Sequence, residues 1–266
     1  MNKTINKNDI PVVILAGGKG TRISEKTNII PKPLIKIRQI PIIFHIMTIF
    51  AFYGYKNFII ASGYKSILLK NYFNNKLNLT KSLYKKKYKI INKFPNIFND
   101  WEINIQNTGI ETLTGGRILR LKNFIKNRKL FFLTYGDGLA NVNIEELLKK
   151  HLVNKKNPII TLSAVRPPAR YGSLKFKNNN QIHNFKEKDR MNEGWINGGF
   201  MVCNSSILNL IKDDRTILEK NILEKASKKG LLFAYKHDNY WQSMDTMRDY
   251  RILQEHSKKN KLPWLF

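Results

Sequence analysis

The chain of 266 residues contains a single cysteine, Cys203. One thiol cannot form an internal disulfide, and it excludes the paired Cys-x-x-Cys ligands of structural zinc sites. Because Cys203 lies in an apolar stretch, we expect it to be an inert thiol in the core. A chain of this length buries roughly 70–75% of its unfolded surface, so its core needs no covalent cross-links.

Long hydrophobic runs are also absent. The longest, such as residues 12–16 and 41–44, fall far short of the ~18 residues that a membrane span requires. The first nine residues, MNKTINKND, lack the apolar segment and the small-residue cleavage site of a secretion signal. We therefore expect a cytoplasmic protein without a membrane-spanning segment.

Acidic residues are scarce: 19 Asp and Glu face 47 Lys and Arg, which gives a formal net charge of +28. No acidic residue occurs between Glu25 and Asp100, where 14 Lys and Arg stand. Such an excess is typical of proteins that bind nucleic acid or anionic surfaces. However, the 36 Lys, 34 Ile and 31 Asn indicate the composition of an AT-rich genome. We favour the compositional explanation and expect no nucleic-acid partner, since no RNP, KH or helix-turn-helix pattern is present.

Buried-strand and helix patterns alternate through the first 165 residues, which predicts a parallel sheet with right-handed crossovers. The segment 74–100 interrupts this alternation, and we interpret it as strands and loop that leave the main sheet. We expect strands at 12–15, 57–61, 103–106, 131–134, 159–165, 196–203 and 231–237, a hairpin at 173–176 and 182–186, and helices at 41–52, 65–73, 117–126, 144–154, 216–229 and 246–258.

A glycine-rich loop, AGGKGTR, follows the first strand. Gly17, Gly18 and Gly20 let backbone amides approach an anion, and Arg22 adds a fork that suits phosphate. The loop is not a Walker A motif, because no Gly-Lys-Ser/Thr ends it. It is not a dinucleotide fingerprint either, because Ile23 stands at the third glycine position. The pattern predicts a phosphate-binding loop.

Three charged residues belong with this loop. Lys32 lies between Pro31 and Pro33, whose rings stiffen the backbone around a cation that must meet a phosphate. Asp137 follows a strand, at the sheet edge where open α/β folds bind ligands. Asp245 is the second candidate carboxylate, although an Asp before a helix can also be an ordinary N-cap. Two such carboxylates suit Mg²⁺, which uses one or two of them together with substrate phosphates.

Two further motifs contain paired glycines. The TGGR run at 114–117 either presents helix N-terminal amides to a ligand or forms a tight turn. The glycines of Asn197-Gly198-Gly199 weaken a strand and indicate close approach of another group.

Eight short motifs of one known protein family occur along this sequence in the family's order. Together they resemble bacterial glucose-1-phosphate cytidylyltransferases, a branch of the sugar-nucleotide pyrophosphorylase family, from Val12 to Trp264. The first two motifs indicate only the wider family, and the TGGR, RPP and C-terminal motifs select the branch. The motifs are LAGGKGTR at 15–22, PKP at 31–33, TGGR at 114–117, TYGDG at 134–138, VRPPARYG at 165–172, FKEK at 185–188, WINGGF at 195–200 and WQSMDTMRD at 241–249.

The resemblance implies a Rossmann-like, three-layer α/β fold of the nucleotidyltransferase (GT-A-like) type, with a mostly parallel sheet and a β-rich sugar-binding part. It implies a single domain over residues 1–266, with the excursion at about 74–100 and a short C-terminal helical extension at about 246–266. It also implies a homo-oligomer, and a product, CDP-glucose, that feeds sugars of O-antigen and other lipopolysaccharide.

The activity that the resemblance implies is Mg²⁺-dependent transfer of a cytidylyl group from CTP to α-D-glucose 1-phosphate. Arg22, Lys32 and Asp137 would be catalytic, and Asp137 and Asp245 would hold Mg²⁺. Residues implied to bind the nucleotide are Leu15, Ala16, Gly17, Gly18, Gly20, Thr21, Arg22, Thr108, Arg117 and Gly136. Residues implied to bind the sugar phosphate are Lys188, Asn197, Gly198 and Trp241.

Three positions depart from the family pattern. Asp189 and Ser243 replace prolines, and Ala169 replaces a glycine. None of these changes removes a charged group, so we expect an active enzyme. The alternatives are a transferase that uses dTTP or UTP, a basic nucleic-acid-binding protein that has kept the fold, and a catalytically silent paralogue.

Overall fold

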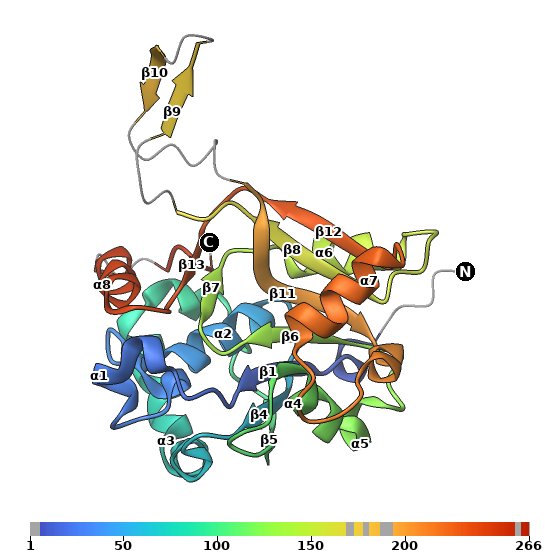
Figure 1. Cartoon of the computed structure of the whole chain (residues 1–266). Coiled ribbons are helices and arrows are strands. Elements are labelled where there is room, and N and C mark those ends of the chain that lie inside the picture. The colour runs from blue at the N-terminus through green and yellow to red at the C-terminus, as the bar shows by residue number, and fades with distance from the viewer. Residues whose placement is uncertain (1–5, 169–172, 178–180, 187–193, 259–261, 266) are drawn as a thin grey trace.

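The computed structural model describes residues 6–168, 173–177, 181–186, 194–258 and 262–265. Its centre is a seven-stranded sheet in the order β12-β8-β11-β6-β1-β4-β5 (Figure 1). Only β11 runs antiparallel to its neighbours, β6 and β8, so the predicted mostly parallel sheet is confirmed. The strands are β1 (Val12–Ala16), β4 (Asn57–Ser62), β5 (Glu102–Asn107), β6 (Leu130–Tyr135), β8 (Ile160–Val165), β11 (Ile196–Asn204) and β12 (Leu232–His237).

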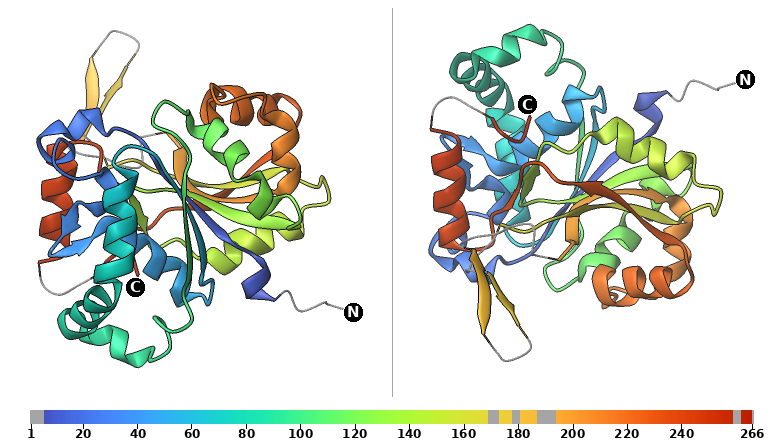
Figure 2. Two further views of the ribbon diagram at one scale, coloured as in Figure 1. Left: turned by 90° about the horizontal axis from the view of Figure 1, so that it is seen from below. Right: turned by 90° about the horizontal axis from the view of Figure 1, so that it is seen from above.

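Helices cover both faces of the sheet, which gives the three predicted layers (Figure 2). Alternate residues of β1 face opposite layers: Val12 and Ile14 join one core cluster, and Val13 and Leu15 join the other. The first layer contains α2 (Ile42–Phe52), α3 (Ser66–Lys87), α6 (Ile144–Leu152) and α8 (Met247–His256). The second contains α4 (Thr114–Arg120), α5 (Lys122–Ile125) and the π-helical turn Leu218–Leu223, which continues into α7 (Glu224–Lys228).

Short strand pairs complete the fold. The antiparallel hairpin of β9 (Ser173–Phe176) and β10 (Ile182–Lys186) was predicted and projects from the body in Figure 1. A second pair joins β7 (Gly138–Ala140) to β13 (Trp241–Ser243), and a third joins β2 (Lys36–Ile37) to β3 (Ile40–Pro41). The one-turn helix α1 (Ser24–Thr27) follows the glycine-rich loop. Within the described residues, no helix is both long and apolar enough to span a membrane.

The segment 74–100 differs from the prediction. It contains no strand: α3 continues to Lys87, and a 3₁₀ helix at Lys89–Lys93 follows. The reason is a helical spacing of buried side chains, since Phe73, Thr80 and Tyr84 all face the core. The many Asn and Lys residues on the exposed positions conceal this period in the sequence.

Two predicted helices are interrupted, and several local details agree. The helix expected at 117–126 divides into α4 and α5 at Leu121, and the one expected at 216–229 begins with the π-helical turn. Asn143 caps α6 as predicted, because its side chain accepts from the Glu146 amide. Cys203 is fully buried, and burial raises the pKa of its thiol.

Candidate active site

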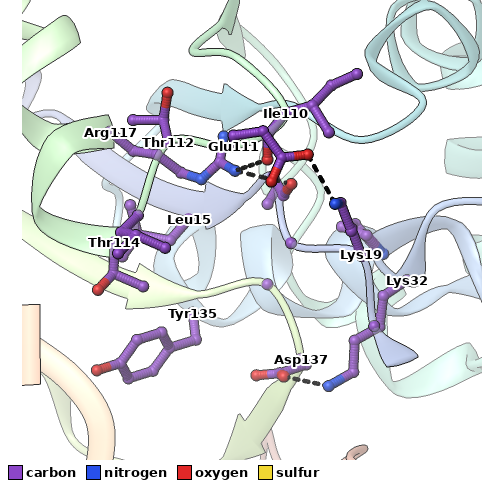
Figure 3. Close-up of a pocket in the computed structure, with 17 residues that line it drawn as sticks. Leu15, Lys19, Lys32, Ile110, Glu111, Thr112, Thr114, Arg117, Tyr135 and Asp137 are labelled. Carbon is purple, nitrogen blue, oxygen red and sulfur yellow. Dashed lines mark hydrogen bonds and ion pairs between the residues drawn. The ribbon is translucent and has the colours of Figure 1, made fainter. Parts of the chain in front are cut away.

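A cavity of about 410 Å³ lies at the carboxyl ends of β1 and β6 (Figure 3). The glycine-rich loop forms one wall, and the loop from Ile110 to Thr114 forms another. Lys32, on the 3₁₀ turn Lys32–Leu34, and Asp137, just after β6, stand together at one side. The cavity is therefore built where the topology of a parallel sheet places ligands.

A second cavity, of about 330 Å³, adjoins the first and shares Tyr135 and Asp137 with it. Asn197 and Gly198 of β11 line it together with Trp241 of β13, whose indole N–H donates to the Gly198 carbonyl at 2.8 Å. Two separate ligands could thus approach Asp137 from two sides.

Three charged groups meet where the cavities join. The Lys32 Nζ lies 2.6 Å from Asp137 Oδ2 and 2.7 Å from Asp245 Oδ1. Burial by itself would lower the pKa of Lys32, but the two carboxylates outweigh it and raise the pKa. Arg22 lies at the edge of this group, 3.9 Å from Asp245, with 78% of its side chain exposed.

Backbone contacts hold the residues Asp137 and Asp245 beside each other. The Met244 amide donates to the Asp137 carbonyl at 2.9 Å, next to the pairing of β7 with β13. Asp245 does not cap α8. Thr246 is the N-cap and forms a capping box with Asp249, so the Asp245 carboxylate is free to accept from Lys32.

Arg117 of α4 lies beneath the glycine-rich loop and is 4% exposed. Its Nη1 donates to the Thr108 hydroxyl and the Gly109 carbonyl, both at 2.7 Å, and to the Ser62 carbonyl at 3.2 Å. Its Nη2 donates to the Gly17 carbonyl at 3.0 Å and to the Ile110 carbonyl at 3.3 Å. Burial lowers the pKa of this guanidinium. Arg117 thereby ties together the end of β4 and the segments that follow β1 and β5.

The family model for nucleotidyl transferases matches residues 11–260. The chain belongs to the nucleotidyl transferase family. It is 38% identical over 256 residues to the glucose-1-phosphate cytidylyltransferase of Salmonella typhimurium, covering 95% of this chain and 97% of the relative. It is also 38% identical to the probable glucose-1-phosphate cytidylyltransferase of Bacillus subtilis, covering 89% and 92%.

A solved structure shares the fold of this nucleotidyl transferase. HddC from Yersinia pseudotuberculosis, complexed with GMP-PN, superposes with a TM-score of 0.67 at 22% identity, covering 94% of this chain and 100% of that one. The resemblance inferred from the motifs, to the glucose-1-phosphate cytidylyltransferases, is therefore confirmed by the relatives, and the fold class by the structure.

The structure brings most of the expected site residues of the transferase to the two cavities. Those lining the first cavity are Leu15, Ala16, Gly17, Gly18, Gly20, Lys32, Arg117, Gly136 and Asp137. Those lining the second are Asn197, Gly198, Trp241 and Asp245, together with Asp137. Thr108 lies behind the wall, where its hydroxyl donates to the Ser62 carbonyl at 2.7 Å. Thr21 is exposed beside Arg22, and Lys188, like Ala169 and Asp189, lies outside the described residues.

Two residues that the sequence did not single out belong to the site. The Tyr135 ring lines both cavities, and a Cβ on Gly199 would lie 2.8 Å from it. Glu219 of the π-helical turn accepts from the Tyr135 hydroxyl, and it also accepts from the Thr114 hydroxyl at 3.0 Å. Tyr135 stood inside the TYGDG motif, whereas nothing in the sequence around Glu219 indicated a role.

The carboxylates of this nucleotidyl transferase fit a cation that arrives with phosphates. Among the described residues, no cluster of three or more His, Cys, Asp or Glu side chains could hold a metal alone. Asp137 and Asp245 supply two oxygen donors, which is the number that Mg²⁺ commonly takes from a protein when phosphates and water complete its shell.

Proposed function

We propose that this nucleotidyl transferase moves a cytidylyl group from CTP to α-D-glucose 1-phosphate, giving CDP-glucose and pyrophosphate. The relatives supply the identity of the substrates. The observation that carries the reaction type is the pair of adjoining cavities, which meet at Lys32, Asp137 and Asp245. One cavity takes the nucleotide and the other takes the sugar phosphate.

CTP lies against the glycine-rich loop in the first cavity. Backbone amides at Gly17 and Gly18 face its phosphates, and a side chain at Gly17 would collide with Arg117, because its Cβ would lie 2.1 Å from Nη1. Arg22 stands exposed at the edge, where it meets the phosphates at a modest desolvation cost. The loop thus binds a polyanion mainly through backbone groups held in place from below.

Glucose 1-phosphate lies in the second cavity. Asn197 is oriented there by its own backbone, since its Oδ1 accepts from the Gly199 amide at 2.9 Å. Its Nδ2 points to the Tyr135 hydroxyl at 3.4 Å. Polar groups that are held in this way can select hydroxyls of a sugar while its phosphate faces Asp137 and the nucleotide.

The chemistry is an in-line displacement at phosphorus. A phosphate oxygen of glucose 1-phosphate forms a bond to the α-phosphorus of CTP, and the bond from that phosphorus to the bridging oxygen of the β-phosphate breaks. The nucleophile is already an anion, so no general base is required. The side chains accelerate the step by positioning two anions and by neutralising charge, with Lys32 and Arg22 on the departing pyrophosphate. Asp137 and Asp245 would hold Mg²⁺, which would supply further neutralisation of the phosphates.

The test is release of pyrophosphate with glucose 1-phosphate and Mg²⁺, measured in parallel with CTP, UTP, dTTP and GTP. We expect CTP to give the highest kcat/KM and an Asp137→Asn variant to lose most of the turnover. A higher kcat/KM with UTP or dTTP would replace cytidylyl by another nucleotidyl group. No release with any nucleotide would end the enzyme proposal and leave a silent paralogue.

A further inference from the structure

The Lys32 ammonium occupies the space between the two carboxylates that suit a divalent cation. Its distances to Asp137 and Asp245 are 2.6 and 2.7 Å, and only 14% of the Lys32 side chain is exposed. These are short, charge-assisted hydrogen bonds, which are stronger than neutral ones. The ammonium is therefore held firmly at this position when no substrate is bound.

The backbone keeps Asp137 and Asp245 adjacent if the ammonium leaves. The Met244 amide ties the Asp137 backbone to the segment before Asp245, and the Asp245 amide donates to Asp249 at 3.2 Å. Two adjacent carboxylates repel each other and bind any available cation in preference to standing alone. In this structure Lys32 lies between them and Arg22 lies farther away, 3.9 Å from Asp245; a metal ion at the position of Lys32 would balance them in its place.

We infer that Lys32 is the stand-in cation of the metal-free enzyme, and that it must leave Asp137 and Asp245 before a divalent cation binds there. This inference rests on the proposed function only for the assignment of the metal to this carboxylate pair. Carboxylate oxygens lie about 2.0–2.1 Å from Mg²⁺, so the metal would occupy the space that the ammonium fills. The two cations consequently compete.

Binding of the nucleotide draws the Lys32 ammonium away from Asp137 and Asp245. Lys32 lines the same cavity as Gly17 and Gly18, so the phosphates of a bound nucleotide attract its ammonium away from the carboxylates. Binding of phosphate then favours binding of the metal, and by reciprocity the metal favours binding of phosphate. Lys32 thus makes metal binding at this pair depend on the arrival of the nucleotide.

The experiment measures binding of Mn²⁺ alone to the full chain, by the EPR signal of free Mn²⁺, with no nucleotide present. Lys32→Met keeps the length of the side chain and removes the competing charge. We expect this variant to bind Mn²⁺ roughly tenfold to a hundredfold more tightly than the wild type, the range for losing a hydrogen bond to a charged group. Lys19→Met is the matched control, because Lys19 borders the same cavity but pairs with Glu111 at 2.7 Å.

Equal or weaker Mn²⁺ binding by Lys32→Met, or an equal gain in Lys19→Met, would overturn the inference. Absence of Mn²⁺ binding in both the wild type and Lys32→Met would also overturn it. The gain should disappear when Lys32→Met is combined with Asp245→Asn. If Lys32→Met folds poorly, Lys32→Gln serves instead, with the rise in Tm on adding Mn²⁺ as the readout. Because no turnover enters, failure here is distinct from failure of the pyrophosphate assay with the wild type.

Discussion

Replacing Arg117 by Met tests whether the nucleotide loop is held from below. The guanidinium donates to five acceptors at the end of β4 and on the segments that follow β1 and β5, and it is almost completely buried. Methionine fills much of the same volume but donates no hydrogen bond. The substitution should therefore destabilise the empty protein, before any nucleotide is added.

The magnitude follows from the acceptors that lose their donor. The Gly17 carbonyl still accepts from the Tyr64 amide at 3.0 Å, and the Ser62 carbonyl still accepts from the Thr108 amide at 2.8 Å. The other three acceptors lose the donor that Arg117 supplied. At about 1 kcal/mol net for each, we expect the free energy of unfolding to fall by about 3 kcal/mol. For a chain of this size Tm should fall by about 6–12 °C.

The assay is thermal and urea unfolding of the nucleotide-free protein, followed by KM for CTP. Arg120→Met is the matched control, since Arg120 lies on the same helix and pairs with Asp214 at the surface, and its Tm should stay near that of the wild type. The reasoning is refuted if Arg117→Met unfolds like the wild type while only KM for CTP rises. That result would make Arg117 a residue that contacts the nucleotide and supports nothing else.

Three further predictions concern the loop, the reaction and pH. Gly17→Ala should destabilise the protein by about 1–3 kcal/mol in urea unfolding, because its Cβ would lie 2.1 Å from the Arg117 guanidinium, whereas Gly18→Ala meets open space and should not. Asp137→Ala should lower kcat for pyrophosphate release at least ~100-fold, and turnover near that of the wild type would remove this residue from the mechanism. Burial lowers the pKa of His45 to about 3, so the folded protein keeps it neutral while the unfolded chain binds a proton below about pH 6.5. Stability should therefore fall as pH drops from 6.5, by roughly 2–3 kcal/mol at pH 4.5, and His45→Gln should show a flatter dependence in urea unfolding at each pH.

Much of the fold could be predicted because the central strands are short, continuous apolar runs. Val12–Ala16 and Leu130–Tyr135 are buried along almost their whole length, and the loops after them contain the glycines and the carboxylate of the site. The error at 74–100 arose where burial involves only one narrow stripe of a helix. In α3 the exposed positions dominate the composition, so the tertiary contacts of Tyr72 and Tyr84 decide its structure.

The site could be predicted as a list of residues, but their partners could not. The motifs contain Lys32, Asp137 and Asp245. Asp137 and Asp245 lie 105 and 213 positions after Lys32 in the sequence, and only the fold shows that the three residues form one ion cluster. Arg117 shows a second role that the sequence did not indicate. Its contact with the nucleotide stays a prediction, and its five hydrogen bonds also place it in the scaffold of the loop.

The net charge of +28 belongs to the whole chain and is not repeated by the ion pairs of the site. Within the ion cluster the formal charges cancel, since Lys32 and Arg22 face Asp137 and Asp245. At the first cavity the charges of Lys19 and Glu111 also cancel. The positive excess therefore lies outside these charged groups; α3, for example, has six lysines and no acidic residue. In the proposed mechanism, selection of a nucleoside triphosphate depends on the backbone amides of the glycine-rich loop and on the exchange of carboxylates for phosphates by Lys32, and it does not require a strongly positive surface.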